Sequence, residues 1–275
     1  MSIVATKPTT AHSRKIEVTN RGLAKSEWRK LRSVRSHVIT LVAAGLVLIF
    51  FGVLFSRLAG SSGGHAGPSP STQATDSLST AFGGLNLAQL VLGVLGALIV
   101  TSEYSTGLIR TMFAAVPRRT PVLWAKAVVV GLATWVVMTI AAFTTFFAGQ
   151  ALYAGHAATY SLGDPGVLRT VLGVGVFGAG VTVMGIALGC ILRSTAAAVA
   201  TLIGGLLILP NLIGLLPHSI SDTLTKVLPS SAGSSFTSLT AARDRLSWGP
   251  GLLVFTAWVA GLLVLAAWLV KHRDA

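Results

Sequence analysis

The sequence predicts an all-α integral membrane protein with six transmembrane helices, preceded by an amphipathic interfacial helix. Of its 275 residues, 52% are hydrophobic and only 11% are charged, whereas a soluble domain carries roughly 25% charged residues. Six stretches without Asp, Glu, Lys or Arg reach the ~20 residues that a helix needs to cross the hydrocarbon core. Because polar residues are confined to the ends and a few connections, we expect lipid to surround most of the chain.

The N-terminal segment is predicted to be a flexible basic arm over residues 1–22. The first apolar run begins only after His37, and no small-residue cleavage site ends a short apolar region. We therefore expect no cleavable signal peptide, and the first span should remain in the mature protein.

Residues 23–36 (Leu23 to Ser36) are predicted to form the interfacial helix. At 100° per residue, Leu23, Ala24, Trp28, Leu31 and Val34 share one arc and Lys25, Arg29 and Arg32 another, as in helices that lie at the membrane surface. Glu27 and Arg35 fall in the apolar arc, where we expect them to contact protein. The helix is either a plain membrane anchor or part of a partner-binding device.

The transmembrane domain is predicted over residues 37–275, with the six spans at about 38–58, 82–102, 122–153, 169–192, 194–217 and 249–270. Only Arg193 and its neighbours separate the fourth span from the fifth, which predicts a tight hairpin. Gly185 and Gly189 form a GxxxG spacing in the fourth span, which favours close helix packing. Pro210 is expected to kink the fifth span near its outer end.

The distribution of basic residues predicts that both termini are cytoplasmic. Nine of the 21 Lys and Arg residues precede His37, and cytoplasmic flanks are enriched in such residues. An even number of spans returns the C-terminus to the same side. Of the outer segments, Gly60 to Thr80 has the composition of a flexible loop, and Pro217 to Trp248 has apolar residues enough for short interfacial helices.

Several function classes find little support in the sequence. The net charge of +13 comes from residues that flank the spans, so nucleic-acid binding is not expected. No Gly-Lys pair occurs, which excludes a P-loop within the chain. Ionisable residues are missing from the middle of the spans and the eight acidic residues are scattered. Neither a self-contained ion transporter nor an enzyme is therefore indicated.

A second candidate for function is the connection from Glu103 to Lys126. Glu103 closes the second span, Gly107 permits a turn, residues 108–116 suit a short helix, and Pro117 stops it. Such a helix would present Met112 and Phe113 at the cytoplasmic surface. The connection is either an ordinary loop or a segment that inserts into a groove on a partner protein.

Three segments together resemble bacterial ABC-2 type transporter permeases. They are SEWRKLRSVRS (26–36) before the first span, EYSTGLIRTMFAAVPRR (103–119) after the second, and LPSSAG (228–233) before the sixth. Each motif is short, but their order relative to the spans is that of the family, and the resemblance covers essentially the whole chain.

The resemblance implies a half-transporter, not an enzyme, in the bacterial plasma membrane, pairing with a second permease copy or a paralogue and with two copies of a cytoplasmic ABC ATPase. ATP and Mg²⁺ would be bound by that ATPase and no cofactor by this chain. The coupling segment that seats in the ATPase would comprise Glu103, Tyr104, Thr106, Gly107, Arg110, Met112, Phe113, Pro117, Arg118 and Arg119. The connecting helix, lying on the inner leaflet, would act through Glu27, Trp28, Lys30, Leu31 and Arg32.

The predicted function is thus a permease that exports a hydrophobic or amphipathic substrate, such as a drug, a peptide or a lipid-like molecule. Uncharged polar residues in the spans either line a path for it or form hydrogen bonds between helices; those considered for the path are Asn86, Gln89, Thr182 and Asn211. Two other hypotheses stay open: a membrane scaffold or regulatory protein that binds a cytoplasmic partner, and a passive channel.

Overall fold

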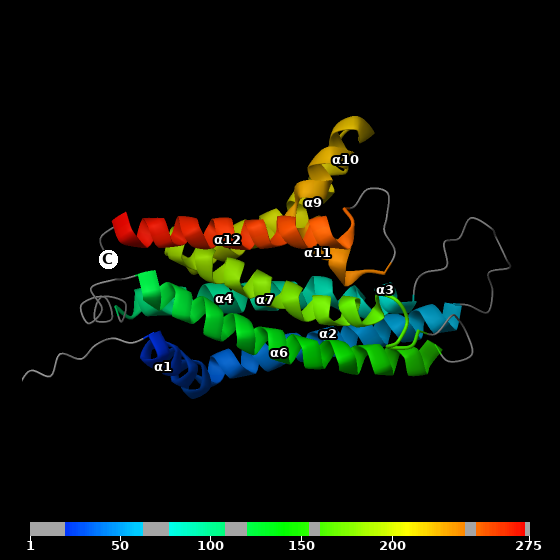
Figure 1. Ribbon diagram of the computed structural model, residues 1–275, viewed down its shortest axis with the longest axis horizontal. Coiled ribbons are helices and arrows are strands. Elements are labelled where there is room, and N and C mark those ends of the chain that lie inside the picture. The colour runs from blue at the N-terminus through cyan, green and yellow to red at the C-terminus, as the bar shows by residue number, and fades with distance from the viewer. Residues whose placement is uncertain (1–19, 63–76, 108–119, 154–159, 240–245, 273–275) are drawn as a thin grey trace, which may run out of the picture.

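The computed structural model describes residues 20–62, 77–107, 120–153, 160–239 and 246–272. All regular structure in these ranges is helical, and the long helices run side by side (Figure 1). The elements are α1 (Asn20–Ser33), α2 (Arg35–Ser62), α3 (Ser77–Ala81), the 3₁₀ turn η1 (Phe82–Gly84), α4 (Leu85–Ser105), α6 (Thr120–Tyr153), α7 (Val167–Leu192), α8 (Thr195–Ile203), the π-helical turn η2 (Gly204–Ile208), α9 (Leu209–Ile213), α10 (His218–Val227), α11 (Pro229–Thr237) and α12 (Trp248–His272).

The predicted fold class is confirmed. In the described part of the chain, six stretches are long and apolar enough to cross a membrane: 35–58, 78–105, 120–152, 167–192, 195–213 and 248–272. The amphipathic helix α1 precedes them as a separate element, and begins at Asn20 rather than at Leu23. The backbone turns at Val34, whose N–H donates to the Lys30 carbonyl at 3.0 Å, and α2 starts at the next residue.

The central helix of the bundle is α7, which packs against α4, α6 and α12. Its glycines allow a close approach to α4, since a Cβ added at Gly185 would lie only 2.5 Å from the Gly93 carbonyl oxygen. Gly189 meets the Ala97 carbonyl in the same way, at 3.1 Å. The close packing predicted from the GxxxG spacing is confirmed.

The predicted tight hairpin between the fourth and fifth spans is also observed. Arg193 ends α7 in the left-handed region with φ 53°, and its N–H donates to the Gly189 carbonyl. Ser194 then caps α8, because its side-chain oxygen accepts a hydrogen bond from the Ala197 N–H at 3.4 Å.

Pro210 changes the fifth span, and the irregularity lies before the proline. Proline has no N–H to donate four residues back, and the preceding turn is widened so that the Leu209 N–H donates to the Gly204 carbonyl. The Asn211 side chain donates to the Leu207 carbonyl at 2.6 Å. The span therefore consists of α8, η2 and α9, with a π-helical turn in its middle of the kind often found at functional sites.

The segment before the last span holds two short helices, but α11 is not a surface element as the sequence suggested. Pro229, Ala232 and Phe236 are buried, and α11 packs on α7 and α12. Phe236 and Phe177 both contact the ring of Phe255, with centroids 5.6 and 5.3 Å apart. This aromatic cluster buries α11 inside the bundle. The neighbouring α10 projects away from it (Figure 1).

The exposed surface of the bundle is strongly apolar, with tryptophans near its ends. Trp28 and Trp268 are exposed towards one end and Trp248 towards the other, which resembles the aromatic belts at the two faces of a bilayer. The C-terminal end of α12 lies at the same end of the bundle as α1 (Figure 1). We call this end, which also carries Glu103 and Arg193, the α1 end.

Candidate functional site

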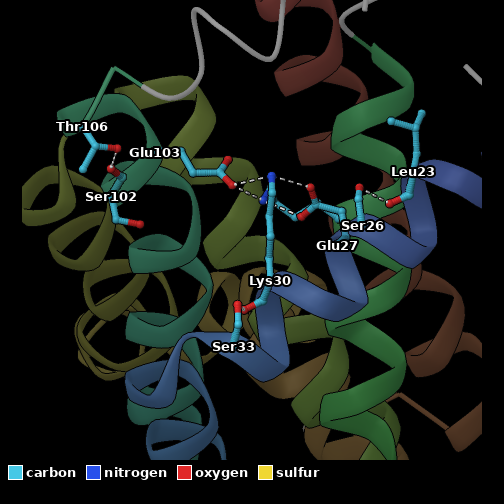
Figure 2. A network of polar contacts seen from close by, with 9 residues as sticks. Leu23, Ser26, Glu27, Lys30, Ser33, Ser102, Glu103 and Thr106 are labelled. Carbon is cyan, nitrogen blue, oxygen red and sulfur yellow. Dashed lines mark hydrogen bonds and ion pairs between the residues drawn. The ribbon is translucent and has the colours of Figure 1, made fainter. Parts of the chain in front are cut away.

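Four charged side chains from three helices meet at the α1 end. Glu27 and Lys30 come from α1, Glu103 from the last turn of α4, and Lys126 from the start of α6. Figure 2 shows Glu27 and Lys30 facing Glu103 across the gap between α1 and α4. We call these four residues the ionic cluster.

Lys126 is the centre of the ionic cluster. Its Nζ lies 2.7 Å from Oε2 of Glu27 and 2.8 Å from Oε1 of Glu103. Lys30 forms longer ion pairs with the same two carboxylates, at 3.0 Å to Glu27 and 3.3 Å to Glu103. The two acids and two bases alternate, so the formal charges within the cluster cancel.

Burial makes this arrangement costly to break. The side chains of Glu27 and Lys126 are 3% and 5% exposed, and that of Glu103 is 11% exposed, whereas Lys30 is 34% exposed. Removing one partner of a buried ion pair costs about 3–5 kcal/mol, because a charge is left uncompensated away from water. The cluster therefore holds α1 onto α4 and α6 as one unit, with Lys30 as its solvent-facing edge.

Other contacts extend this unit to the α7–α8 turn. The guanidinium of Arg193 lies 5.2 Å from the centroid of the Tyr104 ring, a cation–π contact. The hydroxyls of Thr101 on α4 and Thr195 on α8 are 2.7 Å apart. The end of α4 is therefore connected both to α1 and to the turn between the fourth and fifth spans.

The chain leaves the cluster through a defined turn after α4. The Thr106 N–H and hydroxyl both contact the Ser102 carbonyl, at 3.1 and 2.8 Å. Gly107 follows with φ 69°, a conformation that glycine adopts without the strain of a side chain. The turn expected at Gly107 is present. The remaining predicted coupling residues lie outside the described residues; they are Arg110, Met112, Phe113, Pro117, Arg118 and Arg119.

The predicted connecting-helix residues occupy different faces of α1. Glu27 and Leu31 are buried, and Glu27 contacts protein as expected of an acid in the apolar arc. Trp28 is 51% exposed, and Arg32 is exposed as well. Arg35, for which the same kind of contact was expected, is also exposed and begins α2.

A polar cavity of about 590 Å³ lies towards the end of the bundle opposite the α1 end. Its walls come from the start of α4, from η2 and α9, and from α11. The described side chains that line it are uncharged, and serines are prominent among them. The Ser230 hydroxyl is buried and has no hydrogen-bond partner among the described residues.

Three of the four predicted path residues line this cavity: Asn86, Gln89 and Asn211. Gln89 is 3% exposed and its amide donates to the Asn86 side-chain oxygen at 3.5 Å. Thr182 lies elsewhere, fully buried on α7, with its hydroxyl donating to the Gly178 carbonyl at 3.0 Å. A place for Thr182 in the substrate path stays a prediction, and its hydroxyl forms a hydrogen bond within its own helix.

Sequence reasoning missed two parts of these sites. Lys126 was placed only at the end of the connection after the second span, and nothing in its local sequence indicates that it turns inward between two acids. The serines of α11 were overlooked because their helix was expected at the surface. The repeated Ser pairs in PSSAGSS were the available signal.

Comparison with protein families gives one result. A family model described as "ABC-2 family transporter protein" matches residues 23–211. The match begins in α1, includes all four residues of the ionic cluster and ends at Asn211 in α9. No match to a curated protein was found.

The match spans more than half of the chain, from α1 into the fifth of the six candidate spans. It also explains why the sequence motifs occur at the first and second spans. The chain belongs to the ABC-2 transporter family and is a membrane-spanning permease subunit.

Proposed function

We propose that this chain is the membrane half of an ATP-driven exporter, in which a separate cytoplasmic ABC ATPase supplies the energy. The complex would contain two permease subunits and two ATPase copies, with ATP and Mg²⁺ bound by the ATPase. The α1 end would face the cytoplasm of a bacterial cell, which places both termini there. This agrees with the nine basic residues before His37.

The observation that carries the proposal is the ionic cluster. It joins α1 to the end of α4, from which residues 103–119 depart. A push by the ATPase on that segment would reach α1 and α6 through buried, charge-compensated contacts, and α8 through the Thr101–Thr195 contact. Rigid-body motion of packed helices is an established way to transmit such a displacement.

The substrate path would include the polar cavity between α4, α9 and α11. Its amides and hydroxyls are suited to hydrogen bonding with an uncharged polar group, while the apolar helix surfaces around it suit a hydrophobic body. An amphipathic substrate combines both properties. The widened turn η2 gives this wall of the cavity a backbone that can change its hydrogen bonding during transport.

The test is copurification followed by flux. The chain is expressed together with a candidate ABC ATPase, extracted in detergent and placed in liposomes loaded with a fluorescent amphipathic dye. We expect both chains to copurify and dye movement to require ATP. Dye movement without ATP would indicate a passive channel, and a chain that copurifies no ATPase would overturn the proposal. Stable binding of a cytoplasmic partner other than an ATPase would indicate a scaffold.

A further inference from the structure

An apolar groove runs along α1 next to the ionic cluster. It has a volume of about 350 Å³ and lies between α1, α2 and α6, within the ~300–1,000 Å³ usual for small-ligand sites. The turn at Val34 produces it, because α1 and α2 diverge from that point while both contact α6. Figure 1 shows α1 beside the same end of α2 and α6. We call it the α1 groove.

The lining of the α1 groove is hydrophobic throughout its depth. Leu31 and Leu41 are 7% and 6% exposed and form its floor, and the more exposed Trp28 and Leu132 stand on either side. A groove of this kind within the bilayer offers no hydrogen bonds, so a polar ligand would lose its hydration without compensation. Its occupant must therefore be a hydrocarbon.

One charged residue lies at the rim. Among the described residues that line the α1 groove, Arg32 alone is charged, and its side chain is exposed. A guanidinium forms paired hydrogen bonds with phosphate oxygens, and tryptophans such as Trp28 favour the headgroup level of a bilayer. The rim therefore combines a phosphate-binding cation with an interfacial anchor, directly above a hydrocarbon-binding groove.

We propose that the α1 groove binds one anionic phospholipid, with an acyl chain between α1 and α6 and the headgroup phosphate on Arg32. The groove opens on the outer surface of the bundle, where lipid is the neighbouring molecule. The lipid would support α1 next to the ionic cluster, since Leu31 lines both the α1 groove and the cavity beside the cluster. This binding does not depend on whether the chain transports a substrate.

Native mass spectrometry of the purified full-length chain tests the proposal. Phosphatidylglycerol and phosphatidylcholine with identical acyl chains serve as the probes. We expect tighter retention of phosphatidylglycerol, and a loss of about five-fold in that preference for Arg32→Gln, from the typical contribution of one cation near anionic lipid. Arg29→Gln is the matched control, because Arg29 is exposed on the same helix but does not line the groove.

A second pair of variants tests the acyl chain. Ala133→Phe fills the α1 groove and should reduce retention of both lipids, whereas Val128→Phe adds the same ring at an exposed site outside it. Equal loss of preference in Arg29→Gln and Arg32→Gln would show a diffuse basic surface instead of a site. The proposal would also be overturned if Ala133→Phe left lipid retention unchanged, or if it changed the oligomeric state of the protein instead of its lipid retention.

Discussion

Replacing Lys126 with methionine should release α1 from the bundle. The substitution keeps the length of the side chain and removes its charge, leaving Glu27 and Glu103 with Lys30 as their remaining cation in the cluster. The loss of a buried partner costs about 3–5 kcal/mol. Because Lys30 still contacts both carboxylates, we expect the lower end, about 3 kcal/mol.

Hydrogen exchange of the α1 amides measures this effect in the detergent-solubilised protein. A change of about 3 kcal/mol corresponds to roughly a 150-fold faster exchange at those amides that exchange only when α1 opens. Lys30→Met is the matched control. Its side chain is 34% exposed with longer ion pairs, so it should cost at most about 1 kcal/mol, a change of about five-fold.

A double variant sharpens the same test. In Lys126→Met with Glu27→Gln, one carboxylate remains beside one ammonium, so the charges again balance. Exchange in α1 should be slower than in Lys126→Met alone, since coupled partners give non-additive effects. Equal exchange in wild type and Lys126→Met, or additive effects in the double variant, would refute the view that α1 is held by charge compensation.

Three further predictions concern packing and the cavity. Gly185→Ala should lower the free energy of unfolding by about 1–3 kcal/mol, and with it the melting temperature, through a backbone clash between α7 and α4. The control is Gly261→Ala, whose added methyl group faces open space and should leave the melting temperature unchanged. Phe255→Ala should cost about 3–5 kcal/mol by emptying the contact between α7, α11 and α12, measured by thermal unfolding against Phe50→Ala at a 63% exposed site. Gln89→Leu should reduce ATP-dependent dye flux while copurification of the ATPase is retained; full flux would exclude this wall of the cavity from the path.

The spans and their order were predictable because they depend on local properties of the sequence. A run of apolar residues either is long enough to cross the bilayer or is not, and the glycines of the fourth span indicated close packing against another helix. Even the acid in the apolar arc of α1 was recognisable from helical periodicity alone, since a buried carboxylate needs a partner.

The partner of that acid was not predictable, because it comes from a distant part of the chain. Lys126 is separated from Glu27 by 99 positions, and no local pattern indicates which of several basic flanks turns inward. The burial of α11 was missed for the same reason: its segment was expected to hold short helices at the membrane surface, and only its tertiary contacts with Phe177 and Phe255 bury it. Both features depend on tertiary packing.

The rate of ATP hydrolysis by the proposed partner ATPase, measured with and without this chain in liposomes, tests whether the ionic cluster couples the permease to the ATPase. The wild-type permease should change the rate several-fold, and Lys30→Met should largely keep this effect. Lys126→Met should still bind the ATPase but return the rate to that of the ATPase alone. An ATPase whose rate is the same with and without the permease, or one equally affected by wild type and Lys126→Met, would contradict this coupling.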